Sequence, residues 1–121
     1  GLILACLEPD SAIMLVEPIA KRTAFLRQTT YALGLKQVRT LRDRWPCEIE
    51  YADSQIVSRA VIDPALWPEL AMKGGPKVGC IIRMLALHRP LMTIDGFSEA
   101  NSVEYRMPDG SERRIERWTR R

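Results

Sequence analysis

Residues 12–34 read Ala-Ile-Met-Leu-Val-Glu-Pro-Ile-Ala-Lys-Arg-Thr-Ala-Phe-Leu-Arg-Gln-Thr-Thr-Tyr-Ala-Leu-Gly, and this stretch decides the fold. Its first five residues are all apolar, which is typical of a parallel strand covered by helices on both faces. Pro18 suits the first turn of a helix and Gly34 suits its end. We predict a buried strand over 12–16 and then an amphipathic helix. Its inner stripe is expected to be Ile19, Thr23, Leu26, Thr30 and Leu33.

One acidic residue, Glu17, stands between the predicted strand and the predicted helix. In open α/β sheets, ligands bind beyond the carboxyl ends of the strands, and a carboxylate there accepts hydrogen bonds from the hydroxyls of a nucleoside ribose. A solvated glutamate at the start of a helix is the commoner explanation of such a residue. From the residues alone, both interpretations of Glu17 stay open.

The rest of the chain alternates between strand and helix patterns and closes with a hairpin. A hairpin is expected because residues 101–107 and 112–118 flank the turn sequence Pro108-Asp109-Gly110. This order predicts an α/β sheet that is mostly parallel, with an antiparallel edge. The other predicted elements are the tail of a helix at 2–7, strands at 37–41, 55–61 and 78–85, a short helix at 64–73, and a loosely helical stretch behind Pro90 up to Ile94.

Composition is that of one globular domain, 1–121, with 46% hydrophobic and 27% charged residues. No stretch approaches the roughly 20 apolar residues of a membrane span, so no membrane partner is expected. The three cysteines lie far apart, which argues for free thiols in a reducing, cytoplasmic compartment and against a zinc site. With His88 as the single histidine, no metal site is predicted.

Positive charge is concentrated at the end of the chain. The last ten residues, 112–121, hold five arginines and two glutamates, whereas the rest of the chain is neutral. Such a strand can contact nucleic-acid phosphates. It can equally be a solvated sheet edge whose charges discourage aggregation, and composition favours this second explanation.

Five local sequences carry a resemblance to a known family. They are Gly1-Leu-Ile-Leu-Ala-Cys-Leu-Glu-Pro-Asp, Leu15-Val-Glu-Pro-Ile-Ala-Lys-Arg-Thr-Ala-Phe-Leu-Arg, Asp43-Arg-Trp, Val57-Ser-Arg-Ala-Val and Tyr105-Arg-Met-Pro-Asp-Gly-Ser-Glu-Arg-Arg. Together they resemble the ribosomal small-subunit methyltransferase G family, also called glucose-inhibited division protein B. The resemblance implies a Rossmann-like class I methyltransferase sheet. It also implies S-adenosylmethionine-dependent methylation of guanine N7 in small-subunit (16S) ribosomal RNA, which would be the partner.

The same resemblance implies roles for individual residues. Glu17 falls at the family's strand-end carboxylate, which suits the ribose role. Trp45 could stack on adenine, but Pro46 departs from the acidic residue that the family has there. A family lysine expected near Leu85 is absent, and Arg83 and His88 are the nearest cations. The expected cofactor-binding residues are Gly1, Glu17, Arg44, Trp45, Pro46 and Arg59. The expected RNA-binding residues are Arg44, Arg59, Arg83, Arg113, Arg114 and Arg117.

The amino-terminal end of the chain differs most from the pattern of the family. An acidic residue normally follows the glycine-rich cofactor turn by about 20 residues, whereas Glu17 lies 16 residues after Gly1. We therefore expect an amino-terminally truncated domain that lacks the first strand and the glycine-rich turn, with Gly1 as the last residue of that turn. The missing strand would lie between those at 12–16 and 55–61, and each of these would expose an unpaired edge.

No catalytic acid or base is predicted, because guanine N7 carries a free lone pair and no proton. Catalysis would then rest on proximity and in-line orientation. Two other functions remain possible on the sequence. One is a non-catalytic RNA-binding or scaffolding remnant of a methyltransferase fold. The other is an enzyme that binds a nicotinamide nucleotide, although the terminal hairpin argues against it.

Overall fold

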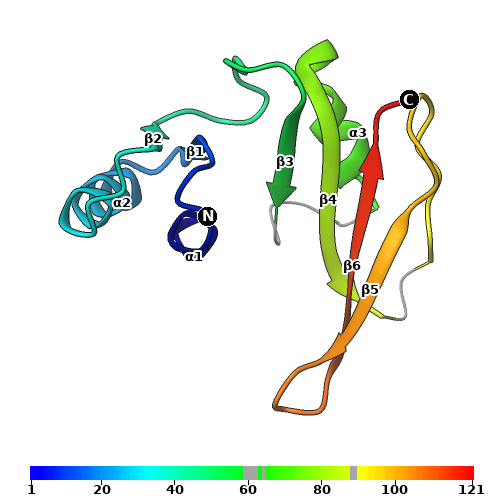
Figure 1. Cartoon of the computed structure of the whole chain (residues 1–121). Helices are drawn as coiled ribbons and strands as arrows, with labels where there is room; N and C mark the ends of the chain where they lie inside the picture. The colour runs from blue at the N-terminus through cyan, green and yellow to red at the C-terminus, as the bar shows by residue number, and fades with distance from the viewer. Residues whose placement is uncertain (59–62, 64, 88–89) are drawn as a thin grey trace. The chain divides into compact units, whose positions relative to one another are not determined.

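A computed structural model of the chain describes residues 1–58, 63, 65–87 and 90–121. The chain divides into two compact units, Gly1–Cys47 and Glu48–Arg121, and each is described here by itself (Figure 1). Both units combine helices with strands, which confirms the α/β class at the level of secondary structure. The single domain predicted over 1–121 remains a prediction.

The first unit is a pair of parallel strands with two helices. In chain order its elements are α1 (Leu2–Leu7), β1 (Ile13–Val16), α2 (Ala20–Ala32) and β2 (Val38–Leu41). All four were predicted, each within a few residues of its observed bounds. β1 and β2 pair in parallel register, with Ile13 opposite Val38. Ala5 of α1 and Leu15 of β1 are buried in this unit, as expected for the apolar segments in which they lie.

Helix α2 buries a narrower stripe than the sequence predicts. Thr23 and Thr30 are buried, but the terminal members of the predicted stripe, Ile19 and Leu33, are 47% and 55% exposed. The Thr23 hydroxyl donates to the backbone carbonyls of Glu17 and Ile19, which ties the first turn to the end of β1. The helix ends as predicted, because Gly34 takes a positive φ of 66°.

The second unit is a four-stranded sheet in the order β3-β4-β6-β5. β3 and β4 are parallel, and β6 pairs antiparallel with both β4 and β5 (Figure 1). This confirms the predicted parallel strands and the terminal hairpin. Residues 59–62, 64 and 88–89 lie outside the described residues, so the end of the predicted strand at 55–61 is untested. The elements are β3 (Ser54–Ser58), α3 (Trp67–Met72), a 3-10 turn (Gly75–Lys77), β4 (Val78–Ala86), β5 (Asn101–Arg106) and β6 (Glu112–Thr119).

The core of this unit includes the face of the sheet that carries Ile81 and Trp118, and the first residues of β4 are buried on both faces. Ile81 and Trp118 are fully buried there, and Phe97 is nearly so. The indole of Trp67 on α3 donates to the Ile82 carbonyl at 3.1 Å, which fixes the helix against β4. Gly79 is required by packing, because a Cβ at this position would lie 2.7 Å from the Asp53 Cα.

The basic terminal strand is not the edge that composition favours. β6 lies between β4 and β5, and it is β5 that forms the outer strand, with all six residues exposed. An edge role for the arginines of 112–119 is therefore wrong. The final strand lies inside the sheet because its inward residues can be buried, Trp118 as an apolar side chain and Arg114 and Glu116 as an ion pair.

The predicted helical stretch behind Pro90 is also wrong where the structure describes it. Residues 90–94 form no helix. The carbonyl of Pro90 accepts from Arg83, and the carbonyl of Met92 accepts from the Trp118 indole at 3.1 Å. Side chains from the sheet thus occupy the acceptors that a helix would have used, and proline contributes no N–H.

The Rossmann-like arrangement and the missing first strand remain predictions. Among the described residues, β1 pairs only with β2, and β3 pairs only with β4. β1 thus lies in a two-stranded sheet, and β3 is an end strand of the four-stranded sheet.

Replacing Gly34 by alanine should destabilise the protein by about 1–2 kcal/mol, because a Cβ disfavours the left-handed backbone found there. Urea unfolding of the purified protein measures this change. Gly34→Asn is the matched control and should cost less, since asparagine tolerates this conformation. Equal stability of the Gly34→Ala variant and the parent would contradict the assigned role.

The hairpin turn should weaken in acid. The hydroxyl and the backbone amide of Ser111 donate to the Asp109 carboxylate and hold its pKa below the ordinary value. A lowered folded-state pKa contributes stability above the unfolded pKa of about 3.9, and this is lost as the pH falls through the folded value. An NMR titration should therefore show Asp109 titrating low, and Ser111→Ala should raise its pKa. Ser102→Ala on β5 should leave it unchanged.

Candidate functional site

Glu17 lies directly after β1, at the carboxyl end of the strand, as predicted. Its Oε1 accepts a hydrogen bond from the Ile19 backbone N–H at 2.9 Å, and its Oε2 lies 4.0 Å from the Arg22 guanidinium. The Glu17 side chain is 20% exposed. The carboxylate thus supports the start of α2 and still presents part of its surface to a ligand.

Gly1 caps α1 and packs against β1. A Cβ at Gly1 would lie 2.3 Å from the Leu15 Cδ2, so a side chain here would displace the buried leucine. This close approach of backbone to strand is a packing requirement. A role for Gly1 in holding a cofactor stays a prediction.

The segment after β2 holds three of the predicted site residues. Arg44 and Pro46 are exposed, and Trp45 is half-buried. The Arg44 backbone N–H donates to the Asp43 carboxylate at 2.7 Å, and Pro46 has no N–H to donate. Burial, and then the negative charge of Asp43, raise the pKa of the Cys47 thiol. Neither Arg44 nor Pro46 thus has a backbone amide ready for a ligand.

Two predicted cations cannot be placed. Arg59 and His88 lie outside the described residues. Ser58 is the last described residue of β3 and stands opposite Arg83 in the parallel register. The role of Arg59 therefore remains a prediction.

Arg83 and Arg114 have a different role from the one expected. Both are buried, with exposed fractions of 2% and 7%, and both contact the fully buried carboxylate of Glu116. Arg83 Nε donates to Oε2 at 2.8 Å and one of its Nη atoms adds a second bond, while Arg114 Nε donates to Oε1 at 2.9 Å. These two guanidinium groups are internal ion-pair partners, because the alternation of β4 and β6 turns them inward. They are not exposed contacts for RNA.

Arg113 and Arg117 lie on the opposite face of β6. Arg117 is exposed, Arg113 is half-buried, and neither forms an ion pair among the described residues. Residues opposite one another in an antiparallel pair share a face. The register of β5 and β6 therefore places Glu104, Glu112 and Glu116 together on the other face. The hairpin separates its charges, with its acidic residues on one side and these two arginines on the other.

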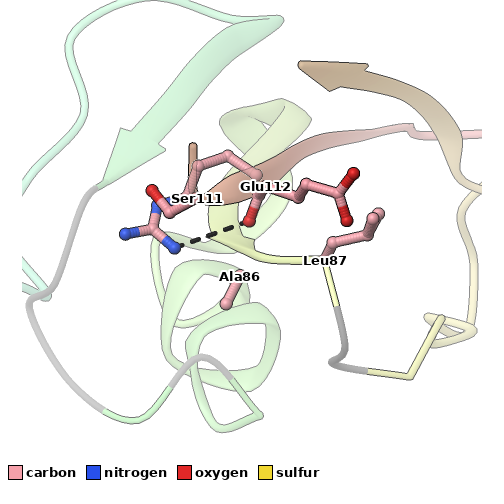
Figure 2. A pocket seen from close by; sticks show the side chains of 5 residues that line it. Ala86, Leu87, Ser111 and Glu112 are labelled. Carbon is pink, nitrogen blue, oxygen red and sulfur yellow. Dashed lines mark hydrogen bonds between the residues drawn. The ribbon is translucent and has the colours of Figure 1, made fainter. Parts of the chain in front are cut away.

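An open hollow of about 390 Å³ lies where the hairpin meets the end of β4 (Figure 2). The Arg113 guanidinium donates to the backbone carbonyl of the preceding residue, Glu112, at 3.5 Å, and Figure 2 draws this bond as a dashed line. The lining of the hollow is Ala86, Leu87, Ser111, Glu112 and Arg113. Of the predicted site residues, only Arg113 lines it, so the hollow does not unite the predicted site.

Two kinds of function find no support in the described part of the chain. No helix there is long and apolar enough to cross a membrane. No group of histidine, cysteine, aspartate or glutamate side chains within those residues could hold a metal ion.

Sequence reasoning missed Glu116. The signal was present, because the alternate residues 114, 116 and 118 of a strand share one face, and Trp118 marks that face as the inner one. Glu116 on an inner face requires cationic partners, and Arg114 is one of them.

Comparison with known proteins confirms the resemblance. A family model described as rRNA small subunit methyltransferase G matches residues 1–86. The ribosomal RNA small subunit methyltransferase G of Desulfotalea psychrophila (strain LSv54 / DSM 12343) is 35% identical over 131 residues, which cover 95% of this chain and 59% of that protein.

Two further relatives carry the same name. The one from Paenarthrobacter aurescens (strain TC1) is 29% identical over 104 residues, covering 86% of this chain and 44% of its own length. The one from Halorhodospira halophila (strain DSM 244 / SL1) is 34% identical over 64 residues, which cover 53% of this chain and 30% of that protein. The chain thus spans less than two thirds of the length of each of these relatives. Because the family match extends over most of its residues, the chain belongs to the rRNA small subunit methyltransferase G family.

Proposed function

We propose that the protein containing this chain transfers a methyl group from S-adenosylmethionine to N7 of a guanine in small-subunit (16S) ribosomal RNA. The observation that carries the proposal is Glu17, which lies at the carboxyl end of β1 in a chain of this family. In a Rossmann-like sheet, this is where a carboxylate accepts hydrogen bonds from ribose hydroxyls. The class I sheet and the cofactor are parts of the same proposal.

The residues present fit such a cofactor in part. Glu17 keeps some exposure, and the half-buried Trp45 offers a ring on which adenine can stack. Pro46 supplies neither an amide hydrogen nor a carboxylate for the adenine amino group. Recognition of adenine would therefore depend on stacking more than on hydrogen bonds.

The proposed reaction requires no proton transfer by the protein. When bound, S-adenosylmethionine supplies an electrophilic methyl group on a sulfonium. Transfer to the guanine N7 lone pair would form a C–N bond as the C–S bond breaks, with the positive charge passing to the guanine, and Glu17 and Trp45 would hold the cofactor. Because N7 bears no proton, no general base is needed, and positioning provides the catalysis.

RNA contacts would come from cationic side chains. A guanidinium can donate two hydrogen bonds at once to O6 and N7 of guanine. Arg44 and Arg59 are the candidates for this contact or for a contact with a nearby phosphate. The target base would have to be unstacked. Arg113 and Arg117 would bind phosphates without regard to sequence, since their face of the hairpin carries no acidic strand residue.

Glu17→Ala should weaken S-adenosylmethionine binding by about 10- to 100-fold, because a charged acceptor contributes about 1.5–3 kcal/mol. Calorimetry on the full-length gene product measures the affinity. Arg22→Ala is the matched control, because it removes the cation beside Glu17 and keeps the carboxylate, and it should change the affinity less than about twofold. An unchanged affinity in Glu17→Ala would refute the ribose role, and a parent with no affinity would favour a non-catalytic remnant.

Arg113→Gln and Arg117→Gln should each reduce the salt dependence of RNA binding by about 0.7–0.9 in the slope of log K against log salt. Thermal unfolding should stay within about 0.5 kcal/mol of the parent, as for most surface changes. The control is Arg106→Gln, because Arg106 is exposed on the other face and pairs with Glu112 at 3.0 Å. Filter binding at several salt concentrations provides the slopes, and equal slopes in all variants would remove this face from the RNA site.

A further inference from the structure

The two buried arginines that contact Glu116 also contact the segment that follows β4. Arg114 donates to the carbonyl of Leu87 at 3.3 Å, immediately after the strand. Arg83 donates to the carbonyl of Pro90 at 3.5 Å and to the Met92 sulfur at 2.9 Å. One carboxylate on β6 is thereby linked through two side chains to three points on this connection.

The remaining contacts hold the arginines themselves in place. The Arg83 guanidinium lies over the Trp118 ring, 5.2 Å from its centroid, and the Trp118 indole donates to the Met92 carbonyl. Each carboxylate oxygen of Glu116 accepts hydrogen bonds from a different arginine. Stability alone does not require such a cluster, because well-packed apolar residues usually replace a buried ion pair without loss. A cluster kept in the core therefore suggests a role in specifying structure.

The connection lies where a ligand site is expected. β3 and β4 are parallel, so their carboxyl ends meet at one edge of the sheet, and ligands bind beyond such ends. Leu87 is the first residue beyond β4 and lines the hollow beside Arg113.

We propose that Glu116 is a positioning residue for the RNA substrate. Through Arg83 and Arg114 it holds the three described residues Leu87, Pro90 and Met92 in place at the edge where RNA would bind. Glu116 touches neither substrate nor cofactor. The effect on catalysis rests on the proposed methylation of RNA, whereas the structural role of Glu116 in holding these three residues does not.

The test replaces the whole cluster by apolar residues, in the triple variant R83M/R114L/E116L of the full-length protein. It should unfold at a temperature no lower than the parent does. Hydrogen exchange should nevertheless rise at least tenfold at the Leu87 amide, which bonds to the Glu112 carbonyl, and at the Trp118 indole, which bonds to the Met92 carbonyl, with α3 unchanged. The KM for 16S ribosomal RNA should rise at least tenfold, with the affinity for S-adenosylmethionine within twofold. A merely structural defect would lower the active fraction and the apparent kcat, and would leave KM unchanged.

Two further variants keep the test decisive. Arg114→Lys retains the charge but offers a single donor group, so it should fold and raise the KM for RNA at least threefold. Arg106→Gln is the matched control, because it removes the exposed pair with Glu112 on the same hairpin without changing a residue that lines the hollow, and it should leave exchange and KM unchanged. Unchanged exchange and KM in the triple variant, or unchanged KM in Arg114→Lys, would overturn the proposal. If the parent methylates no RNA, the proposed function fails, and exchange at the Leu87 amide and the Trp118 indole alone then decides whether Glu116 holds this segment.

Discussion

The buried carboxylate of Glu116 imposes the constraint on which the second unit depends. A charge without access to water is costly unless opposite charges and hydrogen bonds meet it, and Glu116 is fully buried. Arg83 from β4 and Arg114 from β6 supply those charges, one to each oxygen. The two strands must therefore stay in a register that places Glu116 opposite Arg83. The same two arginines also donate to the carbonyls of Leu87 and Pro90, which follow β4.

The inward charges also determine what the outer face of the hairpin can do. A strand alternates its side chains, so the residues between Arg114, Glu116 and Trp118 point the other way. Arg113 and Arg117 are thereby left on a face whose strand residues include no acid. One strand thus combines an internal ion-pair cluster with a surface suited to phosphate. The five arginines at the end of the chain serve several purposes, and composition alone cannot separate them.

Local pattern predicted the elements well where neighbouring residues decide the structure. The strand over 12–16, the helix that Gly34 ends and the Pro108-Asp109-Gly110 hairpin are all present. The helix predicted behind Pro90 is absent, because Arg83 and Trp118 take backbone acceptors of this segment, and Trp118 comes from a strand 26 residues beyond Met92. The edge position predicted for 112–119 was wrong, because the order of strands in a sheet depends on pairing between distant segments.

The sequence by itself determined the α/β class, the place of Glu17 after an apolar strand, and the family, because each is written in adjacent residues. The alternation with Trp118 already marks Arg114 as inward in the sequence, but nothing local marks Arg83. The pairing of β4 with β6 is what places both arginines against Glu116. The physical reason is that burial depends on partners brought together from distant positions, and a buried charge is tolerated only where those partners meet.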